Sequence, residues 1–268
     1  MGINLPNGNE VEEIILPNGA NAREVIGPNG ERVFGGPAIP DSEANQKLRN
    51  RWLYGQNEPF ADQIGSADAT NNGTTEISGD WVDGAARDGD GVGDWVGHTT
   101  LGSFGSSMDT GFAVGLSFAG TEGLSGGAGN SLLGTFNDGS NTAIQIPDAG
   151  NNNRFILIRD DSGNDARVLW SNASNFEDGE PHRIIVNIPD TTNASTYELW
   201  VDQFEESLSI DSDTSPGDFS DFEFPLSFFA RNVRGSILSH TDCILDDICL
   251  FEDSLTQSEI ESYQTPWQ

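Results

Sequence analysis

The side chains of this sequence that could do chemistry are above all carboxylates, because Asp and Glu account for 43 of its 268 residues. A retaining glycosidase needs two carboxyl groups about 5–5.5 Å apart. The adjacent Glu205 and Glu206 would point to opposite faces of an extended strand. Residues 218–224 interleave three acids with three phenylalanines, a pattern that a solvated strand edge explains. We therefore expect no pair of catalytic carboxylates.

Histidine, serine and glycine patterns point to no reaction either. His98, His182 and His240 are far apart in the sequence. The chain contains no Gly-x-Ser-x-Gly elbow and no phosphate-binding loop. The sequence therefore predicts a protein that is not an enzyme.

The charge balance excludes several classes of partner. Twelve basic residues, of which only Lys47 is lysine, stand against 43 acids, so the net charge is −31. Such a surface repels nucleic-acid phosphates and anionic lipids. No apolar run is long enough to span a membrane, and the N-terminus lacks the pattern of a signal peptide. At about 1 M salt the Debye length falls to roughly 3 Å, so the self-repulsion of such a charge costs little. The charge and the near-absence of lysine therefore favour a halophilic origin over an ordinary acidic surface.

The elements that would position any site are short strands. Buried or alternating runs cover residues 112–118, 154–158, 183–188, 197–201, 226–230 and 243–251, with Gly-, Asn- and Asp-rich turns between them. Many short strands at regular spacing predict an all-β, antiparallel two-sheet sandwich over residues 51–268. Only residues 254–263 have the pattern of a helix, which Thr256 or Ser258 could cap.

The first 35 residues repeat a Pro-Asn-Gly triplet every eleven residues, and each triplet is a tight-turn signal. The spacing predicts a small β-meander with strands near residues 9–16 and 20–27, which is too small to bury a core alone. We therefore interpret residues 1–40 as an attachment module that forms a homo-oligomer, the alternative being a decoration of the main domain. The predicted anchor residues are Pro6, Asn7, Gly8, Pro17, Asn18, Gly19, Pro28, Asn29 and Gly30.

Two local predictions complete the organisation. Residues 41–50 are expected to form a linker and a short helix, capped by Asp41 or Ser42. Cys243 and Cys249 are six residues apart in a predicted strand, which places them about 20 Å from each other. Because a disulfide needs Cα atoms within about 7 Å, we expect two buried thiols.

Five segments carry a family resemblance in the same order along residues 51–265. They are residues 51–54 with 60–65, residues 84–96, residues 178–186, residues 199–202 and residues 245–260. Together they resemble laminin-G-like domains of the concanavalin A-like fold, although Pro181 replaces the family's tryptophan and Gln203 its glycine. The resemblance implies a jelly-roll sandwich. With the salt signature and the N-terminal repeats, the chain resembles laminin-G-like surface proteins of haloarchaeal tailed viruses, such as capsid turrets, head fibres or tail fibres.

The resemblance also implies two kinds of site. Domains of this type often hold calcium between an early Asp turn and the closing strand, which here implies Asp62 with Asp246 or Asp247. These carboxylates could equally bond local turns. Lectin-like members bind glycans through exposed aromatic side chains. Trp95 and Trp200 are expected in the core. Trp170 lies beside a loop and is the better candidate, although a core position is the favoured interpretation for it too.

The resulting hypothesis is a non-enzymatic virion surface protein of a haloarchaeal virus. Its N-terminus would attach to other virion proteins, and its lectin-like sandwich would face the extracellular, high-salt medium and bind a host-surface glycan or glycoprotein. Alternatives are a secreted haloarchaeal glycan-binding module or adhesin and, less favoured, a glycosidase.

Overall fold

The structure, a computed structural model, describes residues 25–26, 32–34, 47–52, 62, 68–79, 81, 85–98, 111–124, 130–136, 143–147, 154–160, 162–217, 226–233 and 236–263. Contacts between Cα atoms divide the chain into two compact units, Met1–Asp41 and Ser42–Gln268. No helix in the described part of the chain is long and apolar enough to cross a membrane.

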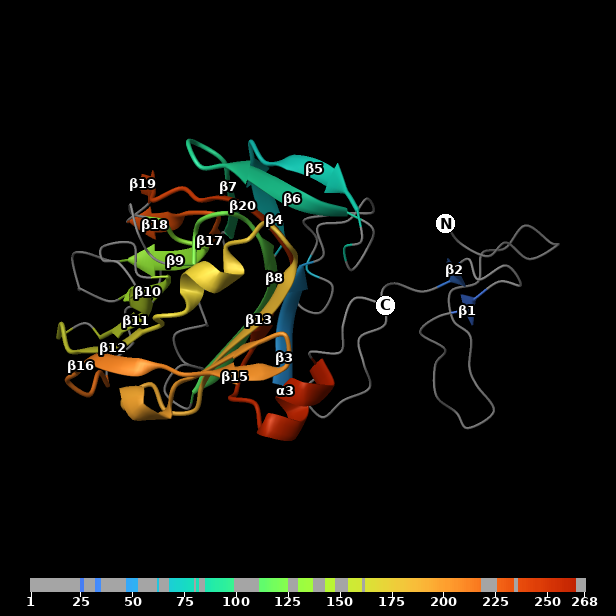
Figure 1. The fold of residues 1–268 in the computed structure, drawn as a ribbon. Coiled ribbons are helices and arrows are strands. Elements are labelled where there is room, and N and C mark those ends of the chain that lie inside the picture. Colours follow the sequence, from blue (N-terminus) through green and yellow to red (C-terminus); the bar gives the residue numbers. More distant parts are fainter. Residues whose placement is uncertain are drawn as a thin grey trace. The chain divides into compact units, whose positions relative to one another are not determined.

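The second unit is a sandwich of two β-sheets (Figure 1). One sheet has the strand order β16-β12-β11-β10-β9-β17-β7-β4, with β18 and β19 attached beside β9. The other has the order β15-β14-β13-β8-β20-β6-β5, with β3 paired to β20. Among the described strands every pairing is antiparallel except that of β18 with β9. The predicted all-β, antiparallel two-sheet sandwich is confirmed.

The first sheet, called here the large sheet, is built from strands with the following bounds: β4 Ala69–Asn72, β7 Trp95–His98, β9 Leu133–Phe136, β10 Ala143–Ile146, β11 Arg154–Arg159, β12 Asp165–Leu169, β16 Ser209–Asp213, β17 Ser227–Phe228, β18 Arg231–Val233 and β19 Ser236–Leu238. The second, called the small sheet, contains β3 Leu48–Trp52, β5 Thr75–Ser78, β6 Ala85–Asp90, β8 Phe112–Ala119, β13 His182–Ile188, β14 Glu198–Val201, β15 Phe204–Glu206 and β20 Asp242–Phe251. Two 3₁₀ turns, η2 Ala173–Phe176 and η3 Ala194–Thr196, and the helix α3 Gln257–Tyr263 complete the sandwich.

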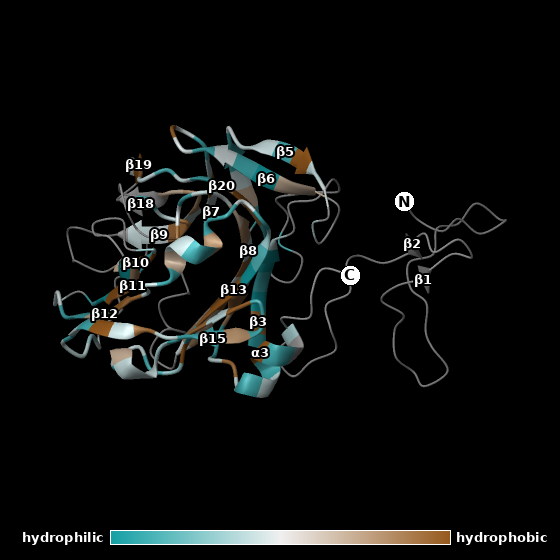
Figure 2. Ribbon diagram, in the orientation of Figure 1, coloured by the Kyte–Doolittle hydropathy of each residue, from teal (hydrophilic) through white to brown (hydrophobic). Residues whose placement is uncertain are grey.

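The core lies between the sheets and follows from the period of two along each strand. On β8, Phe112, Val114, Leu116 and Phe118 all belong to the buried core cluster. Figure 2 shows the same apolar character along β13, where Ile184, Val186 and Ile188 face the core. Cys243 and Cys249 are free and buried, as the spacing predicted.

The short helix predicted within residues 41–50 does not extend to residue 50, because Leu48–Trp52 forms strand β3. Lys47 is helical, and residues 41–46 lie outside the described residues. This strand pairs antiparallel with β20, and Trp52 enters the core with no exposed surface. Backbone pairing to the central strand and burial of a large indole outweigh the weak capping signal on which the helix prediction rested. The sandwich therefore begins at or before residue 48.

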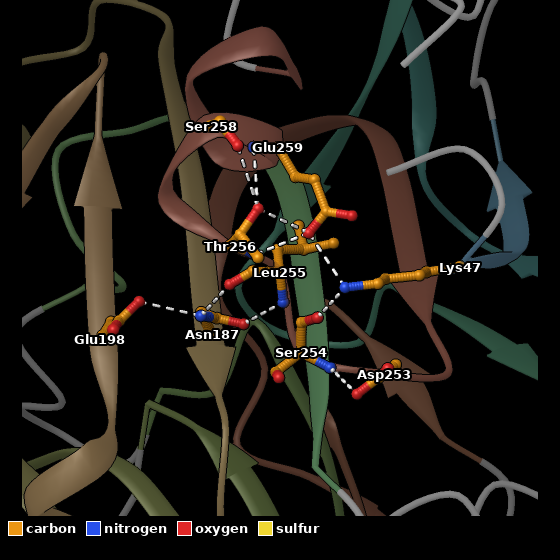
Figure 3. A network of polar contacts seen from close by, with 9 residues as sticks. All are labelled: Lys47, Asn187, Glu198, Asp253, Ser254, Leu255, Thr256, Ser258 and Glu259. Atoms are coloured by element: carbon orange, nitrogen blue, oxygen red, sulfur yellow. Dashed lines mark hydrogen bonds and ion pairs between the residues drawn. The ribbon is translucent and has the colours of Figure 1, made fainter. Parts of the chain in front are cut away.

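The predicted C-terminal helix is confirmed and is held by the network drawn in Figure 3. Thr256 caps it, since Glu259 N donates to Thr256 Oγ1 at 3.4 Å and Thr256 N donates to Glu259 Oε2 at 2.6 Å. This reciprocal pair is a capping box. Asn187 on β13 holds the preceding residue through both Leu255 main-chain groups, at 2.8 and 2.9 Å. The helix is thereby fixed to the outer face of the small sheet.

The first unit has two described strands, β1 Val25–Ile26 and β2 Arg32–Phe34, which pair antiparallel. They flank the third Pro-Asn-Gly triplet in the sequence. The nine predicted anchor residues all lie outside the described residues.

Candidate functional site

The most suggestive aromatic side chain on the described surface is Trp95, on strand β7 of the large sheet. Its neighbour Val96 faces the core with no exposed surface, so Trp95 and Gly97 lie on the outer face. Trp95 is half-buried rather than a core residue, which corrects the prediction from the sequence. A Cβ atom at Gly97 would lie 2.0 Å from Trp95 Cζ3, so the benzo ring occupies the space that a side chain at position 97 would need.

Polar residues of the edge strand β4 lie beside Trp95 on one side. In the register of β4 with β7, Asn72 lies opposite Trp95 and Thr70 lies opposite Gly97. Asn72 Nδ2 donates to the Thr70 main-chain oxygen at 3.2 Å, which orients the amide on the same outer face. An indole beside an amide and a hydroxyl can contact the apolar face of a sugar ring and its hydroxyl groups at once.

The turn between Asp90 and Asp94 fixes the start of β7. Asp90 Oδ1 accepts hydrogen bonds from the amides of Val92 and Gly93 at 2.8 and 3.0 Å, and these bonds lower the pKa of Asp90. Gly73 has φ +103°, and a Cβ there would lie 2.0 Å from Asp94 Oδ1, so only glycine fits against the turn. The close contact of Gly73 with Asp94 thus places the end of β4 against the start of β7, next to Trp95.

Trp170 does not serve as an exposed aromatic platform, which corrects the sequence hypothesis. It has no exposed surface and contacts Phe155 edge-on at 4.8 Å between ring centroids. Phe176 covers its other side at 5.4 Å. The indole Nε1 donates to Glu206 Oε2 at 3.0 Å, so this acid supports the core and is engaged in the fold. The tryptophan precedes a loop in the sequence, yet η2 folds back over it.

Of the three aspartates predicted to bind calcium, Asp62 and Asp247 accept hydrogen bonds or ion pairs from protein donors. Asp62 Oδ2 accepts from Asn50 Nδ2 at 2.5 Å, and its Oδ1 accepts from Arg51 N at 3.1 Å. Asp247 forms ion pairs with Arg51 at 2.6 Å and Arg183 at 3.1 Å. Asp246 is fully buried on β20 and has a polar partner of its own.

This arrangement does not fit a calcium ion shared by Asp62 and Asp247. The carboxylate of Asp247 already neutralises two guanidinium groups, and a calcium ion would have to displace them. Within the described ranges no group of three or more His, Cys, Asp or Glu side chains could hold a metal ion. Calcium binding by this protein stays a prediction from the resemblance.

Asp247 belongs to a closed polar cluster under α3. Burial alone would raise the pKa of Asp247, but Arg51 and Arg183 outweigh it, and the pKa is lowered. Arg183 also donates to Ser117 Oγ and to the Asp247 main-chain oxygen, and its guanidinium lies 4.9 Å from the Tyr263 ring centre. Burial raises the pKa of Cys249 to about 12, so its thiol is not a nucleophile. The cluster holds the helix to the sheet.

His182 joins two segments that the sequence comparison had singled out separately. Its Nδ1 lies 2.6 Å from Asp202 Oδ2, and its Nε2 lies 3.2 Å from Asp178 Oδ1. Burial would lower the pKa of His182, but the two carboxylates raise it above its usual value. The imidazolium fastens the turn before β13 to the β14–β15 hairpin, which is a structural role.

Comparison with known proteins finds similar solved structures. No protein-family model and no curated protein matches the sequence. The receptor binding domain of botulinum neurotoxin C/D mosaic serotype matches at 11% identity and TM-score 0.57, over 82% of this chain and 51% of that one. The binding domain of Paraclostridial Mosquitocidal Protein 1 matches at 12% identity and TM-score 0.60, over 83% and 52%.

A third match is Domain 4 of AbnA, a GH43 extracellular arabinanase from Geobacillus stearothermophilus, solved in complex with arabinotriose. It matches at 13% identity and TM-score 0.54, over 82% of this chain and 98% of that one. The protein therefore spans about half the length of the two toxin domains and nearly the whole arabinanase domain. At these identities the likeness shows the fold, a β-sandwich shared with these domains.

Sequence reasoning missed Trp95 as a site residue, although a local signal was present. In Trp95-Val96-Gly97 the glycine stands two residues after the tryptophan, on the same face of the strand. A glycine at that distance leaves room for a large ring to lie along the strand, which indicates a surface position as readily as a core one.

Proposed function

We propose that the sandwich is a non-enzymatic, lectin-like binding module whose saccharide site is centred on Trp95. The observation that carries this proposal is the half-exposed indole lying across Gly97 on the outer face of the large sheet. The amide of Asn72 and the hydroxyl of Thr70 stand beside it. The likeness to Domain 4 of the arabinanase AbnA supports the proposal, since that domain was solved in complex with arabinotriose.

The proposal is tested by binding of neutral oligosaccharides on a glycan array, with arabinotriose included, in about 1 M salt where charge repulsion is screened. Replacing Trp95→Ala should weaken binding of the best ligand by about tenfold or more, because a ring contact is lost. Phe204→Ala is the matched control, since Phe204 is the most exposed aromatic side chain described, at 73%, but lies on β15 of the other sheet. Equal binding by wild type and Trp95→Ala would refute the site.

We propose further that this module is a virion surface protein of a haloarchaeal virus, with residues 1–40 as its attachment segment. The support is in the sequence: three Pro-Asn-Gly turns in a segment too short for a core, and a net charge of −31 suited to brine. In this proposal the N-terminal segment forms a homo-oligomer on other virion proteins, and the sandwich faces the host surface. Many weak head contacts then add up as avidity.

Sedimentation of the full chain in molar salt tests the attachment proposal. An oligomer is expected, and removal of residues 1–40 should convert it to monomer and abolish its incorporation into particles. A monomeric full-length chain would contradict the proposal, whatever the saccharide experiment shows.

A further inference from the structure

A second feature of the large sheet lies at its far edge from Trp95, on strands β11, β12 and β16, which Figure 1 shows side by side. Arg167 stands between the core residues Ala166 and Val168, so its side chain points to the outer face. Arg159 lies beside it on β11 and pairs in register with Asp165. Arg154, on the same face, forms an ion pair with Asp211 at 2.7 Å. We call Arg154, Arg159, Arg167, Asp165 and Asp211 the arginine patch.

Two guanidinium groups in this patch share a single oxygen atom. Arg159 Nη2 lies 3.2 Å and Arg167 Nη2 lies 2.7 Å from Asp165 Oδ2. The Nε atoms of both arginines are buried and have no hydrogen-bond partner among the described residues. Each guanidinium carries five N–H donors, so one shared carboxylate oxygen leaves most of them without a carboxylate.

A second pair of arginines shares one aspartate elsewhere in the protein, but there each guanidinium contacts a different carboxylate oxygen. Arg51 and Arg183 also share one aspartate, Asp247, but Ser117, a main-chain oxygen and the Tyr263 ring fill the remaining positions around Arg183. The side chain of Arg183 is 8% exposed, whereas those of Arg159 and Arg167 are 21% and 17% exposed. The inner pair is closed by the fold, and the outer pair faces solvent.

The charge of the patch runs against that of the chain. Three arginines and two aspartates give the patch a local charge of +1 in a protein whose net charge is −31. Paired guanidinium groups on a partly exposed face can bind the two oxygens of a carboxylate or the three of a sulfate monoester. In molar salt the repulsion between a bound anion and the acids outside the patch is screened within a few ångströms. Direct contacts at the patch then decide whether the anion binds.

We propose that the arginine patch is a second saccharide site, which takes an acidic sugar through its oxyanion group. Arg159 and Arg167 donate to the oxyanion from the side opposite Asp165, and Arg154 contacts the next unit of the chain. The site needs no aromatic platform, so it stands apart from the site proposed at Trp95. Carboxylate and sulfate share the chemistry that the patch recognises, and the experiment separates them.

The test is titration of the full chain, in about 1 M NaCl, with three probes: a trigalacturonate, its neutral methyl ester and a sulfated trisaccharide. In the Trp95→Ala variant, where the proposed neutral site is impaired, we expect the acidic probes to bind and the ester to bind much more weakly. Arg159→Gln with Arg167→Gln should weaken acid binding by about tenfold or more. Asp165→Asn should tighten it several-fold, because the competing carboxylate is removed. The ratio between the carboxylate and sulfate probes identifies the natural group.

The controls keep this proposal separate from the first one. Arg49→Gln with Arg87→Gln makes the same change in net charge on the small sheet and should leave acid binding unchanged. Trp95→Ala should weaken neutral binding by about tenfold or more and spare acid binding. The patch is refuted if the ester binds to Trp95→Ala as well as the acid does, or if Asp165→Asn weakens acid binding. Circular dichroism of each variant excludes misfolding as the cause.

Discussion

Lys47 Nζ lies 2.9 Å from Glu259 Oε2 and thereby joins the start of the first sandwich strand to the C-terminal helix (Figure 3). The same ammonium donates to the Ser254 main-chain oxygen at 2.7 Å. Burial would raise the pKa of Glu259, but bonds from Thr256 and Lys47 outweigh it and lower the pKa. The only lysine of the chain therefore joins the segment before β3 to the segment at the start of α3.

Replacing this lysine tests its role. Lys47→Met should reduce the free energy of unfolding by about 1–2 kcal/mol, because two charge-assisted hydrogen bonds are lost at a partly exposed position. Urea unfolding in molar salt measures the change. Glu76→Gln, which removes the carboxylate paired with Arg87 at the surface, is the control and should cost less. An equal effect of the two variants would show that Lys47 contributes no more to the free energy of unfolding than a surface ion pair does.

The closed cluster under α3 predicts a larger effect. Asp247→Asn leaves Arg51 and Arg183 buried without their shared carboxylate, which should cost roughly 3–5 kcal/mol of unfolding free energy. Asp242→Asn, an exposed position at the start of the same strand, should change stability little. The two variants are compared by thermal unfolding. A mild effect of Asp247→Asn would mean that water reaches the two guanidinium groups.

Gly97 and Gly93 form a natural pair for testing how Trp95 is placed. Gly97→Ala puts a Cβ into the indole and should cost about 1–3 kcal/mol of stability while moving the ring and weakening saccharide binding. Gly93→Ala meets nothing within 4 Å and should leave both quantities close to wild type. Differential scanning calorimetry and glycan titration measure the two effects. Retention of full binding by Gly97→Ala would place the site elsewhere.

His182 gives the protein a defined dependence on pH. Because its pKa is raised in the folded state, its contribution to stability is complete below the unfolded value of about 6.5 and is lost as pH rises through the folded pKa. The unfolding midpoint of wild type should therefore fall between about pH 5.5 and about pH 9 more than that of His182→Gln. His240→Gln is the control, since His240 Nδ1 contacts the main-chain oxygen of Asp94 rather than a carboxylate. Parallel pH profiles for wild type and His182→Gln would contradict this assignment.

Much of the architecture could be predicted from the sequence because it depends on neighbours along the chain. Alternation along β8 and β13 fixes which side chains face the core, and the Thr256-x-x-Glu259 spacing fixes where α3 begins. The separation of Cys243 and Cys249 along one strand rules out their disulfide for the same reason. These features need no knowledge of what packs against them.

The tertiary structure alone decided the site. The sequence predicts Trp170 beside a loop and Trp95 in the core, yet η2 covers the first, and the ring of the second lies over Gly97 on the outer face. Asp247 became an arginine partner because the sheet brings β3, which pairs with β20, and β13, which lies beyond β8, to either side of it. Whether a ring is covered and which charge meets which carboxylate depend on distant segments brought together by the two sheets. Local sequence patterns do not predict these contacts between distant segments, because the packing free energy that favours them arises only when the two sheets come together.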